Sequence, residues 1–344
     1  MNIRRVLSLL LQLPDQNPFL RDLVMGFEKS QVFMTAAEMG LFDLLEQPAT
    51  ADDVIASLGS HAELTEQFLN VLVALGLLVK DGATYATEPS LAPFIMNKGL
   101  HTIEHYCQHA REDRDDWLRL GLILRAGPLM KPQHQHAFDP GLTRWIGRWA
   151  MLGRLQATLK IVADLPDFQK ARKVIDIGGG HGLFAIGFAQ ENPNVEAYVF
   201  DRPNVTVTTQ EAIAEHGMQD RVKTISGDLS EDDIGSGYDI VFQALSYYKS
   251  REKTVEIYRK VRDALNDGGL FLSQRHLLQN DRTGPTWTLL WDFKWRVARG
   301  RGFAFTEEEF DQVLADAGFS FERSFDLTEH AGMPLKLVVS RKQS

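Results

Sequence analysis

The stretch that decides the fold runs from residue 173 to residue 201 and reads K-V-I-D-I-G-G-G-H-G-L-F-A-I-G-F-A-Q-E-N-P-N-V-E-A-Y-V-F-D. Its β-branched run, Val174 to Ile177, predicts a short buried strand. The glycines that follow let a backbone approach a ligand closely, because glycine has no Cβ. A helix over Leu183 to Gln190 and a second strand over Glu196 to Phe200 complete a βαβ unit with a ligand site at its turn.

Two carboxylates favour S-adenosylmethionine (SAM) over a dinucleotide as the ligand of this turn. Asp201 ends the second strand, where a carboxylate accepts hydrogen bonds from ribose hydroxyls. Asp176 stands two residues before the first glycine, where it would repel a pyrophosphate and attract an ammonium group. The spacing Gly178-x-Gly180-x-Gly182 fits the dinucleotide fingerprint only loosely. A turn without any ligand is the structural alternative.

Length and charge limit the other possibilities. A chain of 344 residues suggests two domains, and a net charge of −9 argues against nucleic acid or an anionic membrane as a main partner. The single cysteine, Cys107, excludes an intrachain disulfide and fits a reducing compartment. No apolar run is long enough to span a bilayer, and the N-terminus lacks a signal-peptide cleavage site. We therefore expect a cytoplasmic protein.

The first hundred residues have a winged helix-turn-helix pattern. Residues 15–47 have helical apolar spacing, Thr50 caps a helix that ends at Leu58, and Glu63 to Leu75 forms another helix before a hairpin that turns at Asp81-Gly82. The helix that would read DNA carries two glutamates and no Lys or Arg, whereas a major-groove reader needs cationic donors. The pattern favours a packing and dimerisation module.

The middle of the chain is helical and aromatic. Trp145 and Trp149 lie there, either in a substrate pocket or in a packed core. Arg144, Arg148 and Arg154 recur at roughly one-turn spacing, which is typical of a solvated helix face. His134 and His136 lack a carboxylate or thiolate at metal-ligand spacing, so we expect solvated loop histidines and no metal site.

Strands and helices alternate from Lys173 onward, with later strands expected at V-K-T-I, D-I-V-F, L-F-L-S and K-L-V-V-S. The predicted fold class is α/β: a Rossmann-like, doubly wound SAM-binding domain behind an N-terminal all-helical winged-helix dimerisation domain. The expected boundaries are 1–100 for the dimerisation domain, 101–165 for a helical linker and substrate-pocket region, and 166–344 for the Rossmann-like domain.

The ordered motifs resemble the small-molecule O-methyltransferases among class I SAM-dependent enzymes, over nearly the whole chain. The matching segments are A-A-E-M-G-L-F-D-L-L, V-I-D-I-G-G-G-H-G, V-F-D-R-P-N-V, D-R-V-K-T-I-S-G-D-L, L-N-D-G-G-L-F-L and F-T-E-E-E-F-D-Q-V-L-A-D-A-G-F. The resemblance implies SAM as cofactor, a small-molecule substrate and a homodimer formed through the N-terminal domain.

Carried over position by position, the resemblance assigns roles in cofactor binding. Asp176 and Gly178, Gly179 and Gly180 would hold the methionine part of SAM. Asp201, with Arg202 beside it, would bind the ribose hydroxyls. Asp228 and Leu229 would meet the adenine.

The chain departs from the family at the catalytic base. Where the family's L-H-D-W motif carries a histidine, this chain reads Leu245-Ser246-Tyr247-Tyr248, and a serine hydroxyl is too weak a base near neutral pH. A supporting glutamate of the family is replaced by Arg275, and His276 follows it. Ser246, Tyr247, Arg275 and His276 are the candidate catalytic residues; Trp145, Trp149, Trp291 and Asp292 are the candidate substrate contacts.

Loss of the base is tolerable for an acceptor without a proton. A thioether attacks through its lone pair, and the planar fork of Arg275 would pair with a carboxylate. The leading hypothesis is S-methylation of a carboxylate-bearing thioether, such as 4-methylthio-2-hydroxybutyrate in dimethylsulfoniopropionate synthesis, by similarity to that branch of the family. The alternatives are an O-methyltransferase that uses His276, Tyr247 or an already ionised phenol, a C-methyltransferase, and a relative that binds SAM without methylating.

Overall fold

A computed structural model describes residues 17–96, 103–131, 140–246 and 249–343. The chain divides into two compact units, Met1–Arg111 and Glu112–Ser344. Among the described residues, no helix combines the length and the apolarity that crossing a bilayer needs.

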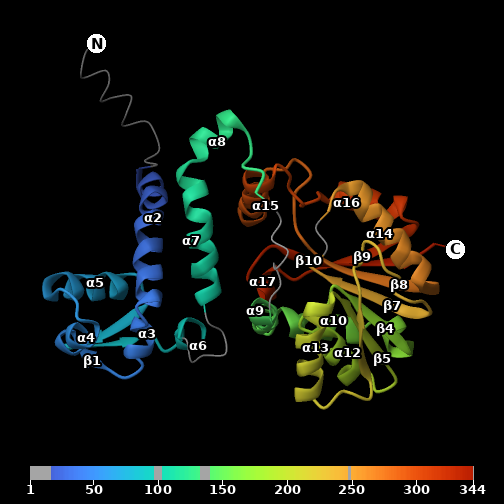
Figure 1. Cartoon of the computed structure of the whole chain (residues 1–344), viewed down its shortest axis with the longest axis horizontal. Coiled ribbons are helices and arrows are strands. Elements are labelled where there is room, and N and C mark those ends of the chain that lie inside the picture. The colour runs from blue at the N-terminus through green and yellow to red at the C-terminus, as the bar shows by residue number, and fades with distance from the viewer. Residues whose placement is uncertain (1–16, 97–102, 132–139, 247–248, 344) are drawn as a thin grey trace, which may run out of the picture. The chain divides into compact units, whose positions relative to one another are not determined.

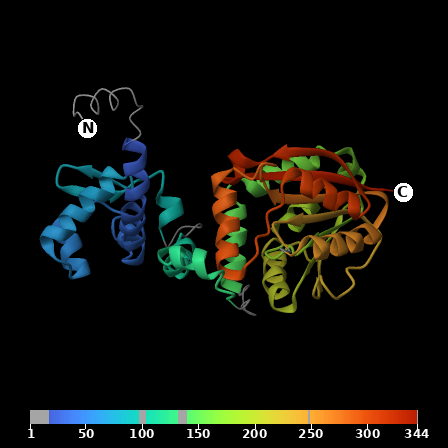
Figure 2. The same ribbon diagram turned by 90° about the horizontal axis from the view of Figure 1, so that it is seen from above.

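The first unit is helical apart from a small sheet. Its helices are α2 (Asn17–Glu38), α3 (Leu41–Leu44), α4 (Ala51–Leu58), α5 (Ala62–Ala74) and α6 (Ala92–Ile95). Strands β1 (Ala49–Thr50), β2 (Leu78–Asp81) and β3 (Thr84–Thr87) form an antiparallel sheet in the order β1-β3-β2. Figure 2 shows these strands beside the helices of the unit. The predicted hairpin is confirmed, and the short strand β1 adds an edge to it.

Local signals in the sequence explain the boundaries of these helices. Thr50 caps α4 by accepting from the Asp53 backbone, while the Asp53 side chain accepts from the Thr50 backbone, so both halves of a capping box are present. The helical pattern predicted over residues 15–47 is broken at Gly40, whose φ of 66° is left-handed. The unit encloses its own core around Leu41, Phe42, Leu69 and Leu72.

The second unit is built on a seven-stranded sheet in the order β6-β5-β4-β7-β8-β10-β9. Its strands are β4 (Lys173–Ile177), β5 (Glu196–Asp201), β6 (Val222–Ser226), β7 (Tyr238–Ala244), β8 (Leu265–His276), β9 (Phe319–Asp326) and β10 (Leu335–Lys342). The first five run parallel, and β10 is antiparallel to both of its neighbours. The predicted α/β class is confirmed; β9 has no counterpart among the predicted strands, because its face is mostly exposed and polar.

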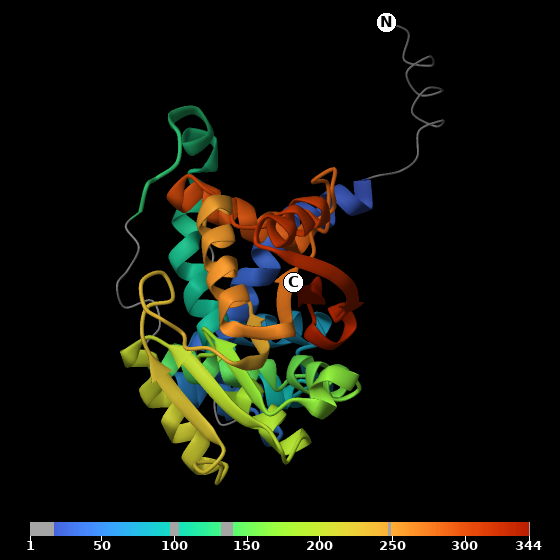
Figure 3. The same ribbon diagram turned by 90° about the vertical axis from the view of Figure 1, so that its right-hand side faces the viewer.

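Helices cover both faces of this sheet, as Figures 1 and 3 show. On one face lie α10 (Arg154–Ala163), α12 (Leu183–Glu191) and α13 (Pro203–Glu215), whose core includes Phe184, Phe188 and Phe242. On the other face lie α14 (Arg251–Ala264) and α16 (Glu307–Asp316), with Tyr258 and Phe310 in the core. The remaining helices are α7 (Glu104–Leu118), α8 (Leu120–Ala126), α9 (Pro140–Ala150), α11 (Pro166–Lys170), α15 (Thr286–Arg299) and α17 (Thr328–Ala331).

The sheet order places the candidate site. The strand order reverses between β4 and β7, and ligands of open α/β sheets bind outside the carboxyl ends of the strands at such a switch point. The glycine turn follows β4, Asp201 ends β5, and Ser246 follows β7. Three segments that are distant in the sequence therefore meet at one edge of the sheet.

Candidate functional site

The glycine turn after β4 needs its glycines for two reasons. Gly178 and Gly180 have φ values of 65° and 51°, a left-handed conformation that other residues rarely adopt. At Gly179 the reason is space, since a Cβ there would lie 2.6 Å from Asp176 Oδ2. The Gly178 N–H donates to the carbonyl of Phe200 at 2.7 Å, which ties the turn to the end of β5. The glycine turn thus places backbone without side chains next to the carboxylates of Asp176 and Asp201.

Asp176 is a buried carboxylate without a partner. It is 1% exposed, and neither carboxylate oxygen has a hydrogen-bond partner. Burial, reinforced by the charge of Asp201, raises the pKa of Asp176 well above its usual range. Because buried polar groups are almost always hydrogen-bonded, an orphaned carboxylate at a glycine turn indicates a ligand that carries a cation. The ammonium group of SAM fits this requirement.

Asp201 is a carboxylate that the backbone holds in place. Gly180 N–H donates to Oδ2 at 2.9 Å and Arg202 N–H donates to Oδ1 at 2.7 Å. Each oxygen keeps a further lone pair, so the carboxylate can accept from two ribose hydroxyls without losing these bonds. Burial raises the pKa of Asp201, while these two N–H groups favour its charged form. The arrangement suits the ribose role predicted for Asp201.

The predicted adenine contacts follow β6. The Asp228 carboxylate is exposed and accepts from Ser230 N–H at 2.8 Å, whereas Leu229 is buried. Hydrogen bonding to the Ser230 backbone lowers the pKa of Asp228, so it is ionised at neutral pH. Leu229 packs in the same core as Phe200, which leads into Asp201. The contacts of Asp228 and Leu229 with adenine stay predictions.

Ser246 packs against the glycine turn. Its hydroxyl donates to the carbonyl of Ile177 at 3.0 Å, and a Cβ on Gly178 would lie 2.6 Å from Ser246 Cβ and Oγ. Leu245, just before it, has a φ of 50°, which is unusual for a residue other than glycine. This geometry makes Ser246 a support of the turn, and its catalytic role stays a prediction.

Arg275 is buried on β8 and is held by the chain around it. Its Nη2 donates to the backbone carbonyls of Phe305 and Thr306, and its guanidinium lies 4.0 Å from the centre of the Phe310 ring. Nη1 is buried and has no hydrogen-bond partner. Burial lowers the pKa of Arg275 to about 10, so the group is still a cation at neutral pH.

His276 lies between two tryptophans. Its ring centre is 4.9 Å from that of Trp287 and 4.6 Å from that of Trp291, and burial lowers its pKa to about 4. The imidazole is therefore neutral at pH 7, with a hydrogen bond to the backbone of Pro334 and a bare Nδ1. Trp291 and His276 line one cavity together with Ser246 and Arg275.

The other predicted substrate contacts are placed differently. Asp292 accepts from the backbone N–H groups of Phe303 and Ala304 and from Arg296, so it closes the loop after α15. Trp145 and Trp149 lie half-buried on α9 and stack on each other at 5.8 Å. Substrate contact by these three residues stays a prediction. Tyr247, together with His134 and His136, lies outside the described residues.

Two buried residues beside the turn were missed as site candidates. Arg154, expected on a solvated face, is only 4% exposed; its guanidinium lies over Trp149 and Phe184, and its charge reaches Asp176. Helical spacing alone does not show which face a helix buries, so the burial of Arg154 could not be predicted from the sequence. His181 accepts from Leu183 N–H through Nδ1, and burial lowers its pKa to about 3. It supports the start of α12 as a neutral ring.

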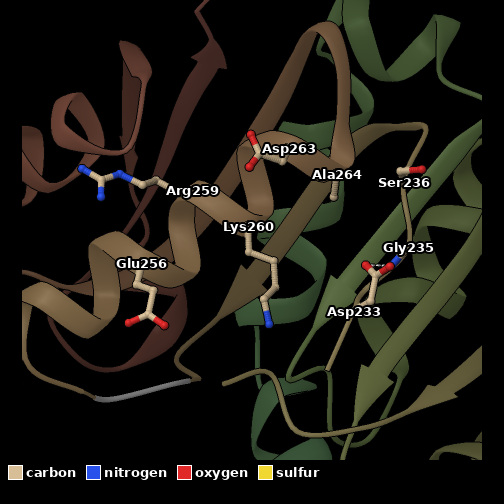
Figure 4. A pocket seen from close by; sticks show the side chains of 8 residues that line it. All are labelled: Asp233, Gly235, Ser236, Glu256, Arg259, Lys260, Asp263 and Ala264. Carbon is tan, nitrogen blue, oxygen red and sulfur yellow. Dashed lines mark hydrogen bonds between the residues drawn. The ribbon is translucent and has the colours of Figure 1, made fainter. Parts of the chain in front are cut away.

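A second cavity, of about 410 Å³, lies away from the turn. Helix α14 and the loop before β7 line it with Asp233, Gly235, Ser236, Glu256, Arg259, Lys260, Asp263 and Ala264 (Figure 4). Lys260 is engaged there by the carbonyls of Leu229 and Asp232. None of the predicted site residues lines this cavity. Within the described ranges, no cluster of three or more His, Cys, Asp or Glu residues could hold a metal ion.

Comparison with known families gives two matches that cover most of the chain. Residues 149–320 match the O-methyltransferase domain, and residues 21–91 match the O-methyltransferase dimerisation domain. The first match contains the glycine turn, Asp201, Ser246 and Arg275. The second lies within the first unit.

Individual relatives methylate different kinds of atom. The chain is 29% identical to 3-hydroxy-5-methyl-1-naphthoate 3-O-methyltransferase of Streptomyces sahachiroi, over 89% of this chain and 90% of that one. It is 28% identical to the N,N-dimethyltransferase OxyT of Streptomyces rimosus, over 87% and 90%. A solved structure, PigF with SAH, superposes with a TM-score of 0.81 at 22% identity, covering 96% of this chain and 99% of that one.

Proposed function

Because the chain belongs to the O-methyltransferase family, we propose that it transfers the methyl group of SAM to a small acceptor whose attacking atom carries no proton at the moment of transfer. SAM supplies an electrophilic methyl group on a sulfonium sulfur. The chain's own contribution is then mostly to position the acceptor in line with that methyl group.

The state of Ser246 supports a transfer without a base. Its hydroxyl donates to Ile177, and a serine hydroxyl is in any case too weak to take a proton near neutral pH. The imidazole at the same cavity, His276, has a pKa of about 4 and is a poor base for a weakly acidic hydroxyl. A hydroxyl that ionises by itself in solution needs neither residue. In keeping with the family, we propose O-methylation of such an acidic hydroxyl as the main reaction.

A pH–rate series tests this proposal. Purified protein is given SAM and a set of phenols whose own pKa values differ by several units, and kcat/KM is measured against pH. Without an enzyme base, the inflection of each profile follows the pKa of that phenol. An inflection that stays at one pH for all phenols would reveal an enzyme base, and would contradict the proposal.

A thioether is the second candidate acceptor, because it never carries a proton. The acceptor would be a carboxylate-bearing thioether such as 4-methylthio-2-hydroxybutyrate. The cationic guanidinium of Arg275 would attract its carboxylate. The rate with a thioether should not change with pH in the range where phenols ionise. Formation of a sulfonium product, detected by mass spectrometry, decides for this candidate; its absence with turnover of phenols decides against it.

Each of the two carboxylates would bind one group of SAM. Asp176 would pair with the ammonium group and Asp201 with the ribose hydroxyls, while Gly178, Gly179 and Gly180 would leave room for the methionine part. Arg202 would flank the ribose, and Asp228 and Leu229 would border the adenine. The match to the dimerisation domain supports a homodimer, which sedimentation of the purified protein would test.

A relative that only binds SAM would behave differently. It would return SAM unchanged after incubation with every acceptor, whereas a methyltransferase converts SAM to S-adenosylhomocysteine during turnover. The homologous methyltransferase domain favours turnover.

A further inference from the structure

The chain leaves β7 through a corner that contains a strained residue. Leu245, the first residue after the strand, has a φ of 50°, a left-handed conformation that a leucine keeps only where its surroundings hold it. Its N–H donates to the carbonyl of Gln274 at 3.3 Å, and Ser246 follows it. The β7 corner, Leu245 and Ser246, therefore depends on contacts that keep the chain from relaxing to an ordinary φ.

A buried amide supplies one of these contacts. Gln243, near the end of β7, is buried, and its Nε2 donates to the backbone carbonyl of Ser246 at 3.1 Å. This hydrogen bond spans Leu245, since it joins the residue two before it to the residue after it. It therefore opposes a change in the backbone conformation of Leu245.

Tyr258 fixes the orientation of the Gln243 amide. Tyr258 lies buried on α14, and its hydroxyl donates to Gln243 Oε1 at 2.9 Å. Burial raises the pKa of Tyr258 to about 12, so the phenol keeps the proton that this bond needs. The rings of Phe271 and Phe310 pack edge-on against its ring. Because the amide oxygen is bound by the phenol, the amide presents its NH₂ group to the carbonyl of Ser246.

The β7 corner also joins the two sides of the site. Ser246 Oγ donates to the carbonyl of Ile177 at 3.0 Å, and a Cβ on Gly178 would lie 2.6 Å from Ser246, so the corner packs directly against the glycine turn. Leu245 and Ser246 line the same cavity as Arg275. A shift of the corner therefore changes the distance between the glycine turn and the wall of this cavity.

We propose that Gln243 and Tyr258 are positioning residues for methyl transfer: Gln243, oriented by Tyr258, holds the β7 corner in its left-handed conformation and so fixes the acceptor side against the glycine turn. The inference rests on the proposed function, because the corner would align the acceptor with the methyl group of SAM. Small errors in such an alignment slow an in-line transfer strongly. The Ser246 hydroxyl is a minor part of this hold, since the bond from Gln243 ends on the backbone and survives in Ser246→Ala.

Gln243→Met tests the hold, because it keeps the length of the side chain and removes both hydrogen bonds. With the phenol that the pH–rate series shows to react fastest, kcat at saturating SAM should fall by at least about tenfold. The affinity for S-adenosylhomocysteine, measured by calorimetry, should change by less than about twofold, since Asp201 and the glycine turn keep their own hydrogen bonds. A kcat within about twofold of the wild type would overturn the inference.

Tyr258→Phe and Tyr238→Phe form a matched pair. Tyr238 is also a buried tyrosine whose hydroxyl donates to a carbonyl, that of Ile234 at 2.7 Å, but it begins β7 at the opposite end of the strand. Each variant loses one buried hydrogen bond, so their urea midpoints should fall alike. Only Tyr258→Phe should lose kcat, by about threefold. Equal kcat values in the two variants would show that Tyr258 has no positioning role.

A glycine at the strained position tests how Gln243 acts. Glycine adopts a φ of 50° without strain, so Leu245→Gly removes the tendency of the corner to relax. The effect of Gln243→Met is measured within each background, because Leu245→Gly itself changes the cavity wall. Gln243→Met should lower kcat by less than about threefold in Leu245→Gly, against at least about tenfold in the wild type. The same loss in both backgrounds would show that Gln243 does not act through the corner.

Amide hydrogen exchange reports the hold without turnover. In the complex with S-adenosylhomocysteine, exchange of the Leu245 N–H should be faster in Gln243→Met and in Tyr258→Phe than in the wild type, and unchanged in Tyr238→Phe. Unchanged exchange in Gln243→Met would overturn the inference. If no acceptor is methylated while exchange at Leu245 still rises, the hold on the corner stands and the proposed function falls.

Discussion

The polar and charged side chains on the two sides of the sheet's switch point are held in different ways. At the ends of β4 and β5, Asp176 has no partner and Asp201 is held only by backbone N–H groups. At the ends of β7 and β8, Ser246 donates to a carbonyl and Arg275 is held by two carbonyls and a ring. The cofactor side thus keeps carboxylates with unused hydrogen-bond acceptors, whereas the acceptor side keeps single unpaired atoms.

The two sides of the site therefore depend on different parts of the chain. The residues proposed for the methionine and ribose parts of the cofactor lie on one continuous βαβ unit. The acceptor side assembles atoms from β7, β8, α15 and the loop before α16, so each one depends on packing elsewhere. Four substitutions test this contrast.

The largest effect is expected for Gly178→Ala, because Gly178 lies where the glycine turn contacts Ser246. The alanine would have to keep a φ of 65° and would place Cβ 2.6 Å from Ser246. We expect a loss of about 2 kcal/mol or more in the free energy of unfolding, and loss of SAM binding. Gly180→Ala is the control, because a Cβ there meets nothing within 4 Å and costs only the backbone strain. Equal urea midpoints for the two variants would contradict the contact with Ser246.

Asp201→Ala tests the held carboxylate. It removes the acceptor for both ribose hydroxyls and leaves Gly180 N–H and Arg202 N–H without their partner. The affinity for S-adenosylhomocysteine, measured by calorimetry, should fall on the order of 100-fold. Asp228→Ala, at an exposed carboxylate, should cost far less. An unchanged affinity in Asp201→Ala would remove the ribose assignment.

Asp176→Asn tests the bare carboxylate and predicts opposite effects on binding and on stability. The folded pKa of Asp176 is raised above its unfolded value, so ionisation destabilises the ligand-free protein as the pH rises through the folded pKa. The variant should be the more stable protein at neutral pH, and its advantage should vanish at acid pH, where the wild-type group is protonated in both states. Melting temperatures of the wild type and the variant across this pH range measure the difference in stability.

The binding effect of the same substitution runs the other way. Without a negative charge for the ammonium group, the affinity for SAM should fall about tenfold. In the wild type, binding should release a proton from Asp176, which calorimetry in buffers of different ionisation enthalpy detects. A variant that binds SAM as well as the wild type would show that Asp176 does not meet the ammonium group.

The smallest effect is expected for Ser246→Ala, on the acceptor side. Only the hydrogen bond to Ile177 is lost, which is worth about 1 kcal/mol. Turnover should change by less than about threefold, compared with the 10²–10⁴-fold that loss of a general base costs. A drop of that larger size in a folded variant would make Ser246 a participant in the chemistry.

Much of the fold and of the cofactor site could be predicted from the sequence because both depend on local patterns. The strand before the turn, the left-handed glycines and the carboxylate at the tip of the second strand lie within 29 consecutive residues. Thr50 and Thr306 likewise begin their helices by capping boxes that span four residues. Strand β9 escaped prediction because its residues are largely exposed and show no apolar alternation.

By itself, then, the sequence determined the α/β class, the glycine turn and the pair of carboxylates, since each follows from the spacing of neighbouring residues. Only the tertiary structure decided the partners of Arg275, Ser246 and Arg154. Arg275 and Arg154 are buried and Ser246 is half-buried against segments that lie far away in the chain, and periodicity says which residues share a face but not what covers it. The acceptor side of the site is therefore a product of packing, and the cofactor side a product of local sequence.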